Sequence, residues 1–294
     1  HRVLAGVDFS RFRTKAATGE ELPEYLGGTV PLIDAYNPVY VPSVLPTLTD
    51  DPVNTLRQVG LYVQDQMRYG PWTAVLGLRH DRVANATAGA ETQDDSANSK
   101  RLGLMYALGG GWSPYVGYSE SFLPQANQFN TRLKPLRGEQ WEVGVKYEPV
   151  GRAMAFNAAA YDLKEKYRTT NPTPTTVAQL GQTRTKGIEL EARGSITPQL
   201  DVIAHYNFTD LDEQLEGLPR HTGSVWGKYR FAVAGMSGFS LGGGMRWFGS
   251  FTDRSSGEGP RIPSTALFDA LLAYETSQWR YALNINNLTN KRYF

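Results

Sequence analysis

The chain has 294 residues, of which 40% are hydrophobic and 20% charged, and its formal net charge is +1. This length fits one large domain or two ordinary ones, and the charge gives no reason to expect a nucleic acid or an acidic substrate as partner. Cysteine is absent, which excludes a disulfide scaffold, a cysteine-ligated zinc site and a thiol nucleophile. No run approaches the roughly 18 apolar residues of a membrane helix, and no charged-then-apolar signal segment opens the chain.

Apolar and polar residues alternate with a period of two along most of the chain, which is typical of strands with one apolar face. The runs from Trp141 to Tyr147, from Val202 to Phe208 and from Trp279 to Ile285 show it clearly. The pattern predicts 13 strands, many longer than the usual 5–6 residues and long enough for the roughly 9–11 of a tilted membrane strand. In chain order they are expected near 2–13, 58–69, 72–83, 98–109, 112–122, 138–149, 153–168, 178–194, 199–209, 221–233, 238–250, 265–275 and 279–288.

The connections between these strands alternate between short and long. The short ones are 70–71, 109–111, 150–152, 195–198, 234–237 and 276–278, and the long ones are 14–57, 84–97, 123–137, 169–177, 210–220 and 251–264. Outer-membrane barrels carry short turns on the periplasmic rim and long loops outside, whereas a soluble β-sandwich has no reason to sort its loops in this way.

Aromatic residues gather beside the predicted short turns, where amphipathic rings favour the boundary between bilayer and water. They are Tyr69, Trp72, Trp112, Tyr147, Phe231, Phe239, Tyr274 and Trp279. The three patterns together predict an all-β, antiparallel transmembrane β-barrel. The strand number is odd, whereas a bacterial barrel needs an even one. Because plugged transporters have 22 strands, we expect residues 1–294 to form one incomplete domain, about 13 strands of such a barrel, truncated at both ends and without a plug.

Several segments, in order, resemble the barrel of TonB-dependent siderophore receptors, in particular the ferrichrome and hydroxamate branch. The segments are Gln58–Gln66 (family pattern roughly xGxYxQDQ), Leu76–Asp81 (LGGRYD, with His80 in place of Tyr), Ser113–Phe122 (YxSYSxSF), Leu136–Lys146 (GxQxExGxK), Thr185–Ala192 (xxGxExE) and Asn287–Tyr293 (NLFDKxY, with Thr289 in place of Phe). The resemblance implies a receptor in the outer membrane of a Gram-negative bacterium that takes up ferric siderophores with energy from the TonB complex. It is not expected to be an enzyme.

The implied partners are a ferric siderophore, the TonB complex through an N-terminal region outside this sequence, and outer-membrane lipid or lipopolysaccharide. Iron stays inside the siderophore, so the resemblance implies neither a cofactor nor iron ligands from the protein. A nucleic-acid partner is not expected, and the receptor is expected to be a monomer. Because the sequence shows no energy-coupling box and no plug, this chain by itself is not expected to transport.

Recognition of a compact polar chelate calls for aromatic faces and a few orienting polar groups. The candidate ligand-binding residues lie on or beside the predicted long loops, and they are Tyr36, Tyr40, Phe122, Phe129, Tyr167, Arg246, Phe248 and Phe251. Arg246 could meet an anionic chelate. The proline-rich loop 14–57 is the expected lid or receptor-specific surface. Packing within loops, or anchoring at the girdle, is the plainer explanation for each of these residues.

Charged residues on the polar faces of the predicted strands are candidate lumenal charges, able to pair with one another or with a plug. They are Asp65, Glu139, Glu142, Lys146, Glu189, Glu191 and Arg193. Gly144 and Gly187 are expected to let their strands curve.

Two other kinds of membrane barrel stay open as alternatives. A passive porin would need closure and a charged constriction. A membrane-barrel hydrolase would need a nucleophile, a base and an orienting group within reach of one another. The candidates for the hydrolase are His80-Asp81 with Asp94-Asp95, or Ser224 beside His221. A soluble β-sandwich lectin is disfavoured by the sorting of loop lengths.

Overall fold

The computed structural model describes residues 1–19, 39, 47–125, 127–128, 131–173, 176–212, 217–252 and 259–293. Thirteen strands form one antiparallel sheet in which each strand pairs with its neighbours along the chain. They are β1 (Arg2–Thr14), β4 (Asn54–Tyr69), β5 (Trp72–Thr87), β6 (Gln93–Tyr106), β7 (Trp112–Leu123), β8 (Leu136–Tyr147), β9 (Met154–Lys166), β12 (Gln182–Ser195), β13 (Leu200–Leu211), β14 (His221–Val233), β15 (Met236–Phe248), β18 (Thr265–Glu275) and β19 (Arg280–Ile285).

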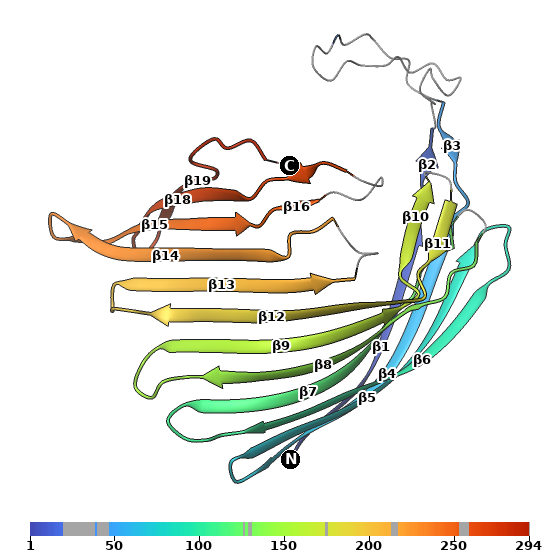
Figure 1. The fold of residues 1–294 in the computed structure, drawn as a ribbon, viewed down its shortest axis with the longest axis horizontal. Coiled ribbons are helices and arrows are strands. Elements are labelled where there is room, and N and C mark those ends of the chain that lie inside the picture. The colour runs from blue at the N-terminus through green and yellow to red at the C-terminus, as the bar shows by residue number, and fades with distance from the viewer. Residues whose placement is uncertain are drawn as a thin grey trace.

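The sheet curves into an open trough, with β1 and β19 as its two edge strands (Figure 1). Tight turns join the strands at one rim, and the longer connections leave from the opposite rim (Figure 1). All 13 predicted strands are confirmed, because the alternation of residues marks a long half-buried strand directly.

Small hairpins within the long connections were not predicted. They are β2 (Ala17–Thr18) with β3 (Thr49–Asp50), β10 (Thr169–Thr173) with β11 (Thr176–Gln179), and β16 (Phe251–Thr252) with β17 (Arg261–Ile262). The prediction of a loop over 84–97 was wrong, since β5 continues to Thr87 and β6 begins at Gln93. These strands have 16 and 14 residues, so the β5–β6 hairpin projects from the rim. Its residues are small and polar, and composition alone does not distinguish such a hairpin from a loop.

One face of the sheet, called the outer face, exposes large apolar side chains on most of its strands. Trp141 is 59% exposed, and Leu76 and Leu190 are 47% and 45% exposed. The residues of this face pair with one another across strands, as in the row Val143, Ala160 and Ile188. A soluble protein would bury such a band, whereas a membrane barrel turns it to lipid.

Aromatic rings cluster on this outer face beside the short turns, as the sequence predicts for a girdle. Trp112 and Tyr147 stack with ring centroids 4.1 Å apart, and Tyr147 continues the stack to Phe156 at 5.9 Å. On the same face but nearer the β19 edge of the sheet, Phe239 stacks on Tyr274 with ring centroids 4.4 Å apart. Within the part of the chain that the structure describes, no helix is long and apolar enough to cross a membrane.

The opposite, lumenal face carries polar and charged groups, but two predicted lumenal charges were placed on the wrong side. Asp65 pairs in register with Val3 and Leu76, and Glu139 lies two residues from Trp141 on the same face. Both therefore belong to the outer face, Asp65 beside His1 (Nδ1–Oδ2 2.8 Å). Strict alternation from the neighbouring apolar residues already requires this, so the error lay in treating every strand charge as lumenal.

Candidate functional site: the lumenal wall

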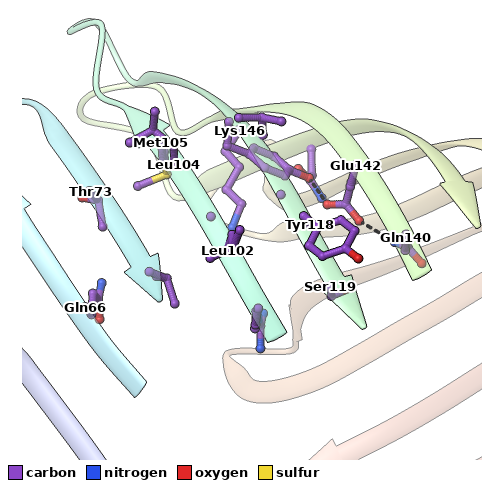
Figure 2. Close-up of a pocket in the computed structure, with 17 residues that line it drawn as sticks. Gln66, Thr73, Leu102, Leu104, Met105, Tyr118, Ser119, Gln140, Glu142 and Lys146 are labelled. Carbon is purple, nitrogen blue, oxygen red and sulfur yellow. Dashed lines mark hydrogen bonds between the residues drawn. The ribbon is translucent and has the colours of Figure 1, made fainter. Parts of the chain in front are cut away.

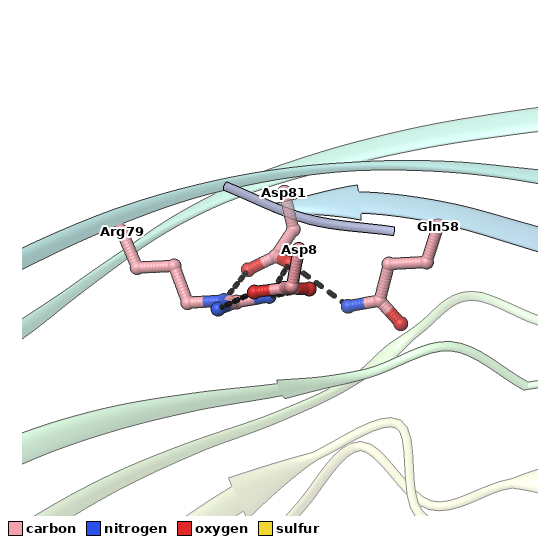
Figure 3. A network of polar contacts seen from close by, with 4 residues as sticks. All are labelled: Asp8, Gln58, Arg79 and Asp81. Atoms are coloured by element: carbon pink, nitrogen blue, oxygen red, sulfur yellow. Dashed lines mark hydrogen bonds and ion pairs between the residues drawn. The ribbon is translucent and has the colours of Figure 1, made fainter. Parts of the chain in front are cut away.

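The centre of the lumenal wall formed by β1, β4 and β5 is a network around one arginine (Figure 3). The Arg79 Nη1 donates to Asp8 Oδ2 at 2.6 Å, and its Nε donates to Asp81 Oδ2 at 2.7 Å. Gln58 Nε2 also donates to Asp81, at 2.8 Å. Asp81 is 2% exposed. A planar guanidinium can bond two carboxylates at once, so Arg79 links β5 to β1, and Gln58 brings β4 into the same network through Asp81.

A glycine makes room for this arrangement. A Cβ built on Gly60 would lie 2.0 Å from Arg79 Nη2 and 2.9 Å from Asp81 Oδ1. Gly60 is the register partner of both Asp8 and Asp81. Any larger residue at this position would push the guanidinium off its carboxylates.

A second polar group lies along β7 and β8, where a hollow of about 450 Å³ opens against the wall (Figure 2). The Glu142 carboxylate is at the centre of this group, because it accepts hydrogen bonds from Tyr115 Oη (2.7 Å) and Gln140 Nε2 (3.1 Å). The Lys146 ammonium lies 5.5 Å from the centre of the Tyr115 ring, within the range of a cation–π interaction. Glu142, Tyr115, Gln140 and Lys146 therefore have partners on the wall of the hollow, which Leu102, Leu104 and Val116 also line.

Three lumenal tyrosines each lie over a glycine that is their register partner. The pairs are Tyr62 with Gly6, Tyr115 with Gly144, and Tyr161 with Gly187. A Cβ added to any of these glycines would come within 2.7 Å of the ring. Gly144 and Gly187 were expected to let their strands curve. In the structure each also leaves room for the tyrosine ring of its register partner, an aromatic–glycine pair across strands.

Arg246 lies on the lumenal face of β15 and is paired across the strand with Asp269. Its Nε donates to Asp269 Oδ2 at 2.9 Å, and its Nη2 donates to Oδ1 at 3.2 Å. Nη1 takes no part in these two bonds. Phe248, two residues on, shares this face and is 36% exposed.

At the long-loop rim, the β7–β8 connection folds back onto the lumenal wall. The Gln93 Nε2 on β6 donates to the Leu133 carbonyl at 2.7 Å, and Leu133 is only 1% exposed. The Asn85 Nδ2 on β5 donates to the Gln125 carbonyl at 3.3 Å. The side chains of Asn85 and Gln93 therefore hold the two ends of this connection against β5 and β6.

A pair of glutamine side chains joins this connection to the one between β9 and β12. The Gln125 Nε2 donates to the carbonyls of Lys134 (2.8 Å) and Tyr167 (2.7 Å). The Gln179 Nε2 donates to the same two carbonyls, at 2.7 Å and 3.1 Å. We call Gln125, Lys134, Tyr167 and Gln179 the rim junction. Tyr167 has a left-handed backbone (φ 67°), a strained conformation that this junction supports.

The predicted ligand-binding residues fall into three groups. Arg246, Phe248, Phe251 and Tyr167 lie at or near the long-loop rim, Phe251 in the small β16–β17 hairpin. Phe122 lies four residues after Tyr118 on β7 and therefore faces the same way, and Tyr118 pairs with Trp141 on the outer face. Phe122 thus lies on the outer face. Tyr36, Tyr40 and Phe129, and most of the loop 14–57, fall outside the described residues.

Sequence reasoning missed the Arg79 network and the rim junction. Arg79 and Asp81 are two residues apart and share a face, which the sequence does reveal. The contribution of Asp8, 71 residues away, depends on the register between strands. The glutamines of the rim junction bond backbone carbonyls, and no motif marks such contacts.

The residues proposed for a hydrolase are not brought together. His80 lies on the outer face and contacts Asn98 (2.7 Å), whereas Asp81 lies on the lumenal face. His221 bonds Tyr206 on the outer face, whereas Ser224 contacts His205 on the lumenal face. Among the described residues no group of three or more histidine and carboxylate side chains is placed to hold a metal ion.

Comparison with known proteins defines the class. Residues 1–288 match the family described as TonB dependent receptor-like, beta-barrel, and the chain belongs to this family. It is therefore part of a receptor barrel of the Gram-negative outer membrane. The family comprises receptors and transporters, which confirms the expectation that the protein is not an enzyme.

Individual relatives place it more closely. Over its whole length the chain is 34% identical to the ferrioxamine B receptor of Salmonella typhimurium (strain SL1344), covering 44% of that protein. It is 31% identical to the ferrichrome outer membrane transporter/phage receptor of Escherichia coli (strain K12), again over its whole length and covering 42% of that protein. The chain thus spans less than half the length of these curated relatives.

Solved structures agree on the fold. The ferric-catecholate import receptor Fiu from K12 E. coli matches with a TM-score of 0.77 at 20% identity, over 99% of this chain and 48% of that one. The ferripyoverdine receptor of Pseudomonas aeruginosa matches with a TM-score of 0.76 at 22% identity, over 99% and 42%. The predicted transmembrane β-barrel architecture is confirmed.

Proposed function

We propose that this chain is the C-terminal barrel portion of a receptor that takes up ferric siderophores, with hydroxamate siderophores as the favoured class. The observation that carries the proposal is the match of residues 1–288 to the receptor family, together with full-length alignment to receptors named for ferrioxamine B and ferrichrome. The lumenal wall supports it, because a polar chelate and a plug both need a polar, partnered surface.

The ligand contacts proposed here lie on the lumenal side of the long-loop rim. Arg246 and Phe248 combine a guanidinium and an aromatic face on one strand. Because Asp269 neutralises much of the Arg246 charge, this arginine acts by donating hydrogen bonds to chelate oxygens rather than as a free cation. Tyr167 and Phe251 contribute further rings, and Tyr36, Tyr40 and Phe129 remain proposed contacts. Phe122 is left out because it lies on the outer face.

In the whole receptor, a plug inside the barrel is proposed to respond to the TonB complex and to release the siderophore. Glu142, Glu189 and Glu191 lie on the lumenal face of β8 and β12. They are proposed to meet cationic groups of that plug, since unlike charges attract strongly where water is scarce. The receptor is proposed to act as a monomer.

The test uses the intact gene in its own bacterium, with siderophore synthesis removed. Uptake of radioactive iron is measured with ferrioxamine B, ferrichrome and a ferric catecholate, with and without the gene. We expect gene-dependent uptake from one of the two hydroxamates, and loss of that uptake when TonB is deleted. Uptake that persists without TonB would indicate a passive porin, and gene-dependent uptake from the catecholate alone would overturn the hydroxamate assignment.

A matched pair of variants tests the proposed contacts. Arg246→Gln removes an arginine near the long-loop rim, and Arg230→Gln removes one near the short turns, paired with Asp201. We expect Arg246→Gln to weaken siderophore binding by about tenfold, as losing one hydrogen bond from a charged donor implies. Arg230→Gln should leave the Kd unchanged. Equal effects of the two variants on binding would contradict this placement of the site.

A further inference from the structure

A groove of about 550 Å³ runs over the outer face beside the short turns, between β7 and β13. One wall is the aromatic stack of Trp112, Tyr147 and Phe156. Leu190 and Tyr206, which pair in register, form the opposite wall.

The floor of the groove consists of alanines. Ala192 pairs in register with Phe156 and with Ala204, and Ala158 pairs with Leu190. A methyl group at each of these positions leaves the space between the walls open. All of these side chains belong to the outer face, and none ends in a charged group.

The position of the groove limits what can fill it. The groove is continuous with the apolar band that faces lipid in a membrane barrel. Its occupant therefore comes from the bilayer, and neither water nor a ligand in the lumen fills it. The aromatic stack marks the boundary of the bilayer on the short-turn side, which is the periplasmic side of an outer-membrane barrel. The lipids of that leaflet are phospholipids.

We propose that this groove is a binding site for one acyl chain of a periplasmic-leaflet phospholipid. Apolar surface alone gives no preference between one lipid and the next, because lipid tails are as apolar as leucine. Shape does, since a chain lying between two walls contacts protein on three sides, and an unfilled groove would forfeit those dispersion contacts. The aromatic rings also let the glycerol and phosphate region lie at the interface, where tyrosine and tryptophan favour a wet edge. The inference depends on the membrane-barrel family and not on the proposed siderophore.

The test is native mass spectrometry of the intact receptor, extracted from outer membranes in a mild detergent and then offered a phospholipid with palmitoyl and oleoyl chains. We expect the wild-type receptor to retain one phospholipid. Ala192→Phe and, separately, Ala204→Leu fill the floor of the groove, and each should abolish the phospholipid-bound peak. Ala266→Phe is the matched control, because Ala266 is on the same outer face but in β18, outside the groove. It should retain the lipid.

Folding is checked by the faster migration of the unheated barrel in electrophoresis, and only folded variants are compared. The proposal is overturned if the floor variants retain phospholipid as the wild type does, if Ala266→Phe loses it equally, or if lipopolysaccharide is the retained lipid. It is also overturned if the wild-type receptor carries detergent only. Siderophore uptake is measured in parallel, and its absence would bear on the proposed function without affecting the lipid result.

Discussion

The outer and lumenal faces of the same strands are held together by different means. On the outer face, apolar side chains such as Ile188 and Leu190 contact their register neighbours and leave much of their surface for lipid. On the lumenal face, Arg79 joins two carboxylates, and Tyr161 lies over a glycine. Along most of the outer face an apolar residue of any shape suffices, whereas the lumenal face depends on particular partners.

The largest expected effect comes from placing a charge on the wrong face. Ile188→Arg puts a guanidinium on the outer face, where the cost near the middle of a bilayer is about 2–4 kcal/mol. The neighbouring Glu189→Arg puts the same group on the lumenal face and should cost far less. Denaturant unfolding in lipid vesicles, followed by tryptophan fluorescence, measures both. Similar losses would show that the two faces do not differ as described.

Next in size is the loss of a lumenal partner. Arg79→Ala leaves the buried Asp81 with Gln58 as its only side-chain hydrogen-bond partner among the residues that the structure describes. Because Arg79 is itself 32% exposed, the expected loss is about 2–3 kcal/mol, less than the 3–5 of a fully buried pair. The double variant Arg79→Gln/Asp81→Asn removes both charges and should recover part of this stability. If the loss in the double variant equalled the sum of the losses in Arg79→Gln and in Asp81→Asn, each measured alone, the ion pair would not be the cause.

A smaller effect is expected where a ring lies over a glycine. Gly187→Ala places a methyl group about 2.5 Å from the nearest atoms of Tyr161, and such overpacking costs about 1–3 kcal/mol. Gly103→Ala on β6 is the control, since its nearest neighbour would be Val75 at an ordinary 3.8 Å. Adding Tyr161→Ala to Gly187→Ala should remove the clash, so the loss of unfolding free energy in the double variant should be smaller than the sum of the two single losses. Strict additivity would contradict the pairing.

The smallest effect on stability is expected at the rim junction. Gln125→Ala and Gln179→Ala each remove two hydrogen bonds to the carbonyls of Lys134 and Tyr167. These bonds hold connections at the rim that can open locally without unfolding the sheet, so little of their free energy should appear in global unfolding. Because this junction positions the connections at the proposed ligand entrance, the double variant should raise the siderophore Kd while the unfolding midpoint changes little. Tyr69→Ala, an exposed ring at the opposite rim, should leave the Kd unchanged. An unaltered Kd in the double variant would remove the junction from the proposed site.

The same contrast explains what the sequence could predict. Strand number, the two rims and the girdle follow from period-two alternation and from turn residues, which act locally. The register partners of Arg79 and the rings over Gly6, Gly144 and Gly187 depend on which residues meet across strands, and the pattern of residues along a strand does not reveal that register. Phe122 shows the limit most clearly, because proximity to a loop made it a ligand candidate although its parity places it on the outer face.

The projecting β5–β6 hairpin has a further consequence for handling the protein. Its tip, residues 88–92, is exposed, and Gly89 has a positive φ of 82° with open space around it. The strands below are paired in register as far as Asn85 and Gln93, so a foreign peptide spliced into the tip need not disturb the wall. This hairpin tip is therefore a suitable place to insert an epitope tag that antibodies can detect on the surface of living cells.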